Sequence, residues 1–289
     1  MSEQKSTYGL IGYPLGHSLS PVMHNAAFEA LEVDATYNLF PLKEEELSSF
    51  LGELKSPDSP IFGLNVTVPY KEKVIPYLDT LNPYAKKVKA VNTIVVGKNR
   101  KLTGYNTDGP GFLTHLTELE FNPQSKRISI LGAGGAARAI LSVFCMADQG
   151  PEWIKIYDID YNKAKALVND LSQSLNCEKV EICQSIDDLN IELSDLLINA
   201  TPIGLKETDV PIIEEDLLHS DMLVYDLIYN PAQTKLLKMA EEKGAKTSNG
   251  LGMLFYQGVL AFQHWAEIDL PEVVRQKMKN ALYEGIKAL

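Results

Sequence analysis

A glycine-rich segment near the middle of the chain has the spacing of a diphosphate-binding turn. It follows the apolar run RISIL and precedes an apolar stretch typical of a helix. Glycine permits a sharp turn that phosphate oxygens can approach, and the first turn of a helix offers free N–H groups and a positive dipole end. Because a strand is expected before the segment and a helix after it, we predict dinucleotide contacts here rather than a ligand-free packing turn. The residues concerned are Gly132, Ala133, Gly134, Gly135 and Ala136.

The acid that ends the next predicted strand bears on the choice of cofactor. Asp158 ends the run WIKIYD, a position from which a carboxylate can bind both hydroxyls of an adenosine ribose and repel a 2′-phosphate. Asp160 follows, and segment 159–163 lacks the arginine that commonly pairs with that phosphate. The charges therefore favour NAD over NADP, although Lys163 can also hold a phosphate. Helix N-capping is the alternative role for both acids, and the better one for Asp160.

Polar residues in the first part of the chain stand at the ends of predicted elements. Ser18 and Ser20 precede Pro21, which suits the first turn of a helix, so two hydroxyls beside a helix N-terminus could hold a carboxylate. The alternative is a simple N-cap at Ser20. Asn65 and Thr67 are two apart on a predicted strand and therefore share one face.

Three further residues complete this polar set. Lys71 follows a proline turn, Asn92 lies inside the apolar run AVNTIVV, and Asp108 belongs to GYNTDG at the start of a predicted helix. A lone lysine is usually a solvated surface charge, and a buried asparagine must find hydrogen-bond partners. Taken together, these clusters predict a ligand site in a cleft at the strand ends, where open α/β sheets bind their ligands.

Strand-like runs alternate with amphipathic stretches, which predicts the α/β class with mainly parallel sheets covered on both faces. In the first part we expect helices at about 21–31 and 44–54 and strands at 8–12, 36–40, 62–68, 90–96 and, antiparallel, 101–105. A doubly wound nucleotide-binding pattern follows, with strands at 127–131, 153–158, 180–183, 196–200 and 223–227 and a helix at 163–175. Stretches 251–265 and 272–289 are expected to form helices that pack back onto the first part.

Composition limits the possible partners. The chain has 289 residues, 45% of them hydrophobic, which is enough for two modest cores. A net charge of -11 disfavours nucleic acid and anionic membranes as partners. The N-terminus lacks the apolar core of a signal peptide, and no apolar run approaches the roughly 20 residues that span a bilayer. Cys145, Cys177 and Cys183 show no CxxC spacing and are expected to be buried thiols in a reducing compartment.

Eight segments, in order along nearly the whole chain, resemble the signatures of shikimate dehydrogenases. They are GYPLGHSLSPVMHN, NVTVPYKE, AVNT, GYNTDGPGF, GAGGAARA, NATPIG, DLIYNP and GLGMLFYQG. The resemblance implies two α/β domains. Residues 1–108, completed by the C-terminal helices 251–289, would form the substrate domain, and residues 109–250 a Rossmann-type nicotinamide domain.

The resemblance also implies roles by position. Lys71 and Asp108 match the family's catalytic pair. The matches to substrate-binding residues are Ser18, Ser20, Asn65, Thr67, Asn92, Tyr229 and Gln257. The matches to cofactor-binding residues are Gly132, Ala133, Gly134, Gly135, Ala136, Asp158, Thr201, Gly250 and Met253. NADP-dependent members carry Asn-Arg-Thr where this chain has Asp158, Ile159 and Asp160, so the resemblance too favours NAD over NADP, without a metal.

The implied activity is reversible hydride transfer between shikimate and NAD(P), a step in aromatic amino acid biosynthesis. Lys71 and Asp108 would both bind the reacting hydroxyl, and the sequence leaves open which of them accepts its proton. The alternatives are an NAD-dependent quinate/shikimate dehydrogenase of quinate catabolism, a reductase of an amino-shikimate or other cyclic polyol, and a nucleotide-binding regulator without turnover. A regulator would need neither Lys71 nor Asp108. We expect a cytoplasmic protein, monomeric or homodimeric, whose partner is a small molecule.

Overall fold

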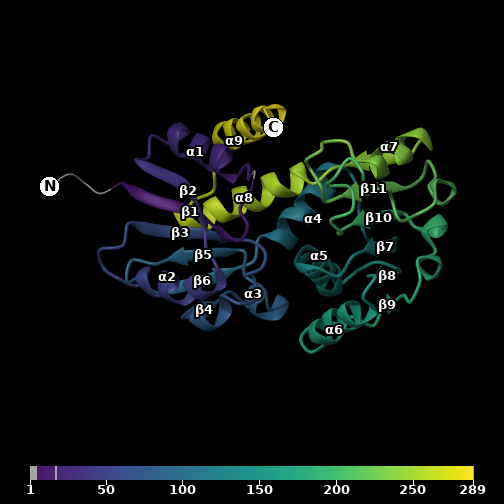
Figure 1. The fold of residues 1–289 in the computed structure, drawn as a ribbon, viewed down its shortest axis with the longest axis horizontal. Helices are drawn as coiled ribbons and strands as arrows, with labels where there is room; N and C mark the ends of the chain where they lie inside the picture. Colours follow the sequence, from purple (N-terminus) through teal and green to yellow (C-terminus); the bar gives the residue numbers. More distant parts are fainter. Residues whose placement is uncertain (1–4, 17, 289) are drawn as a thin grey trace. The chain divides into compact units, whose positions relative to one another are not determined.

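The computed structural model describes residues 5–16 and 18–288, and the chain divides into two compact units. The first is formed by Met1–Gly111 together with Phe255–Leu289, and the second by Phe112–Leu254. Each unit contains one six-stranded sheet with helices packed on it (Figure 1). The predicted fold class, two α/β domains with the C-terminal helices returning to the first, is confirmed. The chain passes between the units inside two helices, α4 (Asp108–Glu118) and α8 (Leu251–Ala266).

The sheet of the first unit has the strand order β2-β1-β3-β5-β6-β4. The strands are β1 (Ser6–Gly12), β2 (Ala35–Pro41), β3 (Ile61–Val66), β4 (Thr80–Leu81), β5 (Thr93–Val96) and β6 (Leu102–Tyr105). The pairings β1–β2, β1–β3 and β4–β6 are parallel, while β5 is antiparallel to both β3 and β6. The antiparallel strand predicted at 101–105 is thus confirmed. The strand expected from residue 90 begins at Thr93, and β4, only two residues long, was not predicted.

Helices cover both faces of this sheet. The helix predicted at 44–54 is a 3₁₀ turn (Glu44–Glu46) followed by α2 (Leu47–Glu53), whose Leu47 and Leu51 join the strand residues in one apolar core. On the other face, α1 (Ser20–Ala30) packs beside α9 (Glu272–Lys287), which carries the C-terminus of the described chain (Figure 1). The short helix α3 (Pro83–Val88) precedes β5. The first sheet is therefore shielded from water on both sides.

The end of α8 is fixed to the first sheet by one aromatic side chain. Trp265 Nε1 donates to the Ile94 carbonyl over 3.0 Å. A Cβ added at Gly63 would lie 2.4 Å from the Trp265 ring, so only glycine admits the ring at that point of β3. Packing of this kind explains why the C-terminal helices belong to the first unit although the whole second unit separates them in sequence.

The second unit is a doubly wound sheet in which every pairing is parallel. Its order is β12-β11-β10-β7-β8-β9. The strands are β7 (Arg127–Leu131), β8 (Trp153–Tyr157), β9 (Val180–Ile182), β10 (Leu196–Asn199), β11 (Leu223–Asp226) and β12 (Lys246–Ser248), and the helices α5 (Gly135–Met146), α6 (Tyr161–Ser172) and α7 (Lys235–Glu242). Winding reverses between β7 and β10, the point at which such sheets bind ligands. No helix within the described ranges is long and apolar enough to cross a membrane.

His24 is fully buried in the aromatic layer between the first sheet and its helices. Its ring stacks on Tyr37 with centroids 4.5 Å apart and an angle of 15° between the planes. Burial disfavours the charged imidazolium and lowers the pKa of His24 from 6.5 to about 3. The folded protein therefore keeps this ring neutral at pH values where the unfolded chain binds a proton.

We expect His24 to make the protein less stable as the pH falls from 6.5 to 5. Below pH 6.5 the unfolded state gains a proton that the folded state excludes, which costs about 1.4 kcal/mol for each pH unit. The free energy of urea unfolding should therefore fall more steeply in the wild type than in His24→Phe, by about 2 kcal/mol at pH 5. His264→Phe, at a half-buried histidine, is the control and should change the slope less. Parallel curves for wild type and His24→Phe would contradict this account.

Candidate active site

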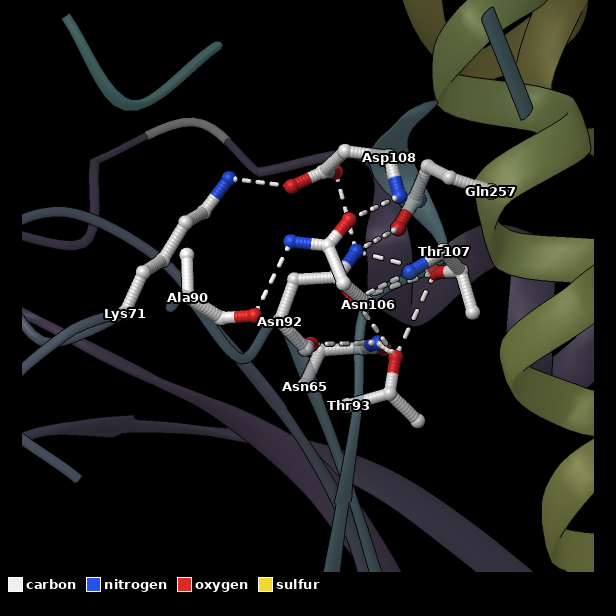
Figure 2. A network of polar contacts seen from close by, with 9 residues as sticks. All are labelled: Asn65, Lys71, Ala90, Asn92, Thr93, Asn106, Thr107, Asp108 and Gln257. Carbon is white, nitrogen blue, oxygen red and sulfur yellow. Dashed lines mark hydrogen bonds and ion pairs between the residues drawn. The ribbon is translucent and has the colours of Figure 1, made fainter. Parts of the chain in front are cut away.

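A largely buried ion pair between Lys71 and Asp108 belongs to the polar network of the candidate site in the first unit (Figure 2). Lys71 follows β3, and Asp108 is the first residue of α4. Lys71 Nζ donates to Asp108 Oδ2 over 2.8 Å, and the two side chains are only 17% and 8% exposed. Lys71 is thus not the solvated surface charge that an isolated lysine usually is. Two oppositely charged groups with little access to water are held in contact.

The Asn92 side chain holds the Asp108 carboxylate from the other side. Asn92 Nδ2 donates to Asp108 Oδ1 and to Thr107 Oγ1, both over 2.9 Å, and to Gln257 Oε1 over 3.3 Å. Asn92 Oδ1 accepts from the Thr107 N–H over 2.7 Å and from Thr93 Oγ1 over 3.0 Å. The prediction that this asparagine must find partners is confirmed, and one of its partners is the carboxylate of the ion pair (Figure 2).

A second layer of hydrogen bonds lies beneath Asn92. Asn65 Nδ2 donates to the Asn92 carbonyl and to Thr93 Oγ1, each over 3.2 Å. Asn65 Oδ1 accepts from the Tyr37 hydroxyl over 2.8 Å. Burial raises the pKa of Tyr37, so its phenol remains a donor at physiological pH. A continuous chain of buried polar contacts therefore runs from Tyr37 through Asn65 and Asn92 to Asp108.

Gln257 reaches this network because two helices approach each other closely. A Cβ added at Gly111 of α4 would lie 2.6 Å from the backbone nitrogen of Gln257 in α8. Gln257 is itself only 8% exposed. Gly111 thus permits the contact of Gln257 with Asn92, and the role of Gln257 in substrate binding stays a prediction.

Ser18 and Ser20 lie at the start of α1, and Thr67 lies just after β3, in the same unit. The Ser18 hydroxyl accepts from the Ser20 N–H over 3.3 Å. Ser20 is the first residue of α1 and Leu19 is the N-cap, so the alternative of an N-cap at Ser20 is wrong. Ser20 is buried. A hydrogen bond between its side chain and Tyr37 lowers the pKa of Tyr37 and so partly offsets the rise that burial causes. Thr67 directly follows β3 and lies against Gly12, where an added Cβ would be 2.4 Å from the Thr67 methyl group.

The second unit brings the glycine turn beside Thr201. Gly132 has φ +95°, and a Cβ there would lie 2.8 Å from the Ala200 carbonyl and 3.0 Å from Thr201 Cγ2. Gly134 precedes the first residue of α5, and an added Cβ at this glycine would meet no atom within 4 Å. A tight turn with open space at a helix N-terminus is the form that admits phosphate oxygens.

Asp158 is a structural partner of the glycine turn. Its Oδ2 accepts from the Ala133 N–H over 2.8 Å, its Oδ1 accepts from the Asp160 N–H over 3.0 Å, and Lys163 Nζ lies 3.3 Å from Oδ2. Although burial acts to raise the pKa of Asp158, these contacts hold it below its usual value. Asp160 accepts from two N–H groups at the start of α6, which confirms its predicted N-cap role.

The remaining predicted residues also lie in the second unit. A Cβ at Gly250 would lie 2.0 Å from the Leu227 carbonyl, and the Gly250 N–H donates to the Ile228 carbonyl over 3.1 Å. The turn before α8 is therefore pressed against the segment that carries Tyr229. Burial raises the pKa of Tyr229, and Met253 is only 9% exposed. The roles of Gly250, Tyr229 and Met253 in binding stay predictions.

Sequence reasoning missed the contact between Asn199 and Asp226, and it missed Tyr37, which lies beneath Asn65. Asn199 and Asp226 end the adjacent strands β10 and β11, and Asn199 Nδ2 donates to Asp226 Oδ1 over 3.0 Å. Asp226 is fully buried, which raises its pKa. Polar residues at the ends of neighbouring parallel strands were the available signal for this pair. Nothing in the sequence around Tyr37 indicates its contact with Asn65.

Comparison with known proteins assigns the chain to a family. Residues 10–94 match the model described as shikimate dehydrogenase substrate binding domain. A shikimate dehydrogenase (NADP(+)) of Carboxydothermus hydrogenoformans is 44% identical over 273 residues, which cover 93% of this chain and 94% of that protein. The chain belongs to the shikimate dehydrogenase family.

Solved structures of family members agree with this assignment. A shikimate dehydrogenase crystallised with NADP⁺ is 38% identical, has a TM-score of 0.86, and covers 98% of this chain and 96% of its own. The shikimate 5-dehydrogenase of Listeria monocytogenes, in complex with shikimate and NAD, is 34% identical with a TM-score of 0.85, covering 96% of this chain and 97% of its own. The family resemblance seen in the sequence is confirmed.

The expectation that NAD is favoured over NADP is wrong. The curated relatives with 41–44% identity are NADP(+)-dependent shikimate dehydrogenases. The charge argument failed because it treated Asp158 as a free anion. In the structure that carboxylate is 9% exposed, hydrogen-bonded to the Ala133 N–H and paired with Lys163, so it presents little uncompensated negative charge to a phosphate.

We expect Tyr37→Phe to destabilise the protein although the change removes one oxygen atom only. Asn65 Oδ1 would lose its donor in a buried position, which costs about 1–3 kcal/mol. Urea unfolding measures the loss, and Tyr283→Phe, at a tyrosine that is 45% exposed, is the control and should stay within about 0.5 kcal/mol of wild type. Equal stability of the two variants would show that the phenol does not hold Asn65.

Proposed function

We propose that this chain is an NADP-dependent shikimate dehydrogenase, which oxidises shikimate to 3-dehydroshikimate reversibly. The observation that carries the proposal is the Lys71–Asp108 pair, buried and held by Asn92. Family membership supports the reaction, and the names of the curated relatives support NADP. In this proposal the first unit binds the substrate and the second binds the cofactor.

Lys71 and Asp108 would handle the proton and the developing charge. NADP⁺, when bound, would supply the hydride acceptor for the carbon that bears the alcohol, and NADPH would supply the hydride in the reverse direction. The Asp108 carboxylate can accept a hydrogen bond from the substrate hydroxyl, while the Lys71 ammonium donates to the same oxygen as negative charge grows on it. Because Lys71 Nζ donates to Asp108 Oδ2 over 2.8 Å, we assign the handling of the proton to the pair as a unit.

The other polar residues would orient the ring. In our proposal Ser18 and Ser20, at the start of α1, bind the substrate carboxylate through their hydroxyls. The remaining ring hydroxyls would be bound by Asn65, Thr67, Asn92 and Gln257. The side chains of Asn65 and Asn92 are already oriented by buried hydrogen bonds, so little ordering is left to be done when the substrate binds. Tyr229 is the further substrate-binding residue in this proposal.

The glycine turn fits a dinucleotide. The positive φ at Gly132 and the space beside Gly134 support binding of the diphosphate at the N-terminus of α5. Thr201, Gly250 and Met253 are the proposed contacts farther along the cofactor. Lys163, whose ammonium is half exposed beside Asp158, is the proposed partner of the 2′-phosphate.

A steady-state comparison tests the function. Reduced cofactor should form when the protein is mixed with shikimate and NADP⁺, and kcat/KM should be higher for that combination than for shikimate with NAD⁺ or for quinate with either cofactor. Absence of turnover with shikimate and both cofactors would reject the proposal.

Lys71→Ala should lower kcat for shikimate oxidation by a factor on the order of 10²–10⁴, the usual range for a positioned acid–base group. The KM for shikimate should change much less. Lys73→Ala is the matched control, because Lys73 is two residues away, 43% exposed and paired with Glu44 on the surface. Near-normal kcat in Lys71→Ala would remove this lysine from the chemistry.

Lys163→Ala should lower kcat/KM for NADP⁺ by about tenfold, while kcat/KM for NAD⁺ changes little, since one charged hydrogen bond to a phosphate is worth about 1.5 kcal/mol. The control is Lys165→Ala, an exposed lysine two residues along α6. The measurement is the ratio of kcat/KM for the two cofactors. An unchanged ratio would mean that Lys163 does not contact the 2′-phosphate.

A further inference from the structure

Two cysteines of the second unit lie side by side, away from the residues used above. Cys145 is in the last turn of α5, and Cys177 lies between α6 and β9. Their sulfur atoms are 3.1 Å apart, and the Cys177 thiol donates to Cys145. Since α5 rises about 1.5 Å per residue, Cys145 is about 15 Å from Gly135 at the phosphate-binding end. Neither thiol belongs to the proposed cofactor site.

The separation of the two sulfurs is close to that of a covalent pair. A disulfide bond is about 2.05 Å long, so the sulfurs need to approach by only about 1 Å. The two residues are 32 positions apart, Cys145 inside α5 and Cys177 after α6, so their meeting is a product of the fold. The fold of the nucleotide-binding unit therefore brings two reduced thiols into bonding range.

The contact between the two sulfurs favours ionisation of Cys177. When Cys177 ionises, the Cys145 thiol becomes the donor to its thiolate, which lowers the pKa of Cys177. The same contact, together with burial, raises the pKa of Cys145, which therefore keeps its proton. A cavity of about 130 Å³ lies beside the pair and is lined by Cys145 and by Asn176 and Glu178, the chain neighbours of Cys177.

We propose that Cys145 and Cys177 are a dithiol modification site that a hydroperoxide oxidises to an intramolecular disulfide. The Cys177 thiolate attacks one peroxide oxygen and the O–O bond breaks. Hydroxide is the leaving group, and Cys177 becomes a sulfenic acid. The Cys145 sulfur then attacks the Cys177 sulfur, the S–O bond breaks, and the departing hydroxide takes the proton of Cys145 as water. In sum, two thiols are oxidised and one hydrogen peroxide is reduced to two waters.

Oxidation would tie together the two helices that follow β7 and β8. These helices are already linked by one ion pair, in which Arg138 Nη1 of α5 lies 2.6 Å from Asp170 Oδ2 of α6. The disulfide would add a covalent link from the end of α5 to the chain beyond α6. It leaves the glycine turn and Lys71–Asp108 chemically unchanged, so this proposal does not depend on the proposed function.

The test exposes the purified full chain to hydrogen peroxide and then alkylates the remaining thiols. Free thiols should fall from the three in the sequence to one, with the intact mass lower by about 2 Da before alkylation, and dithiothreitol should restore them. Trypsin should release peptide 139–155 linked to peptide 166–179. This peptide map of the wild type is decisive even where a cysteine variant folds poorly.

Cys183 provides the matched control. It is 1% exposed, and burial raises its pKa to about 11, so Cys183→Ser should form the disulfide as the wild type does. Cys145→Ser and Cys177→Ser should each lose the linked peptides. The proposal is overturned if peroxide leaves three thiols, if it adds oxygen to single cysteines without a link, or if the link involves Cys183 or a second copy of the chain.

Discussion

A carboxylate withdrawn from water must receive hydrogen bonds on both oxygens, and this requirement at Asp108 organises the first unit. Lys71 satisfies one oxygen and Asn92 the other. An unpaired buried charge costs several kcal/mol, so removal of either partner leaves a penalty that exceeds the value of one ordinary hydrogen bond. The position of the ion pair is therefore fixed by the hydrogen bond from Asn92 as well as by the attraction between the two charges.

The same requirement extends to the elements that carry the partners. Asn92 can face Asp108 only if its backbone and amide are fixed. Asn65 on β3 donates to the Asn92 carbonyl, and the Thr107 N–H, just before α4, donates to the Asn92 amide oxygen. Close approach is secured by glycine, since Gly111 lets α8 reach α4 and Gly63 lets Trp265 reach β3. Glycine in these places is a condition for bringing distant side chains into one network, and helix and strand propensities alone would not require it.

Local patterns predicted the elements and most site residues because each signal lies within a few residues of what it determines. The glycine turn is recognisable from the strand before it and the helix after it, and Asn92 from its position in an apolar strand. The pairing of Lys71 with Asp108 spans 37 residues and was implied by family resemblance only. Tyr37 was missed because alternation along β2 shows which face it is on and not which amide its hydroxyl meets.

The wrong expectation that Asp158 favours NAD also arose from contacts that local sequence does not show. The place of Asp158 at the end of β8 was foreseen, but the effect of a charge depends on what already neutralises it. Here the Ala133 N–H reaches the carboxylate from a turn 25 residues earlier in the chain, and Lys163 reaches it from the first turn of α6. An acid whose hydrogen bonds are already made within the fold acts as a support for the glycine turn, and in our proposal Lys163 beside it meets the 2′-phosphate. The count of acids and arginines in one segment therefore does not reveal how much negative charge Asp158 presents to a cofactor.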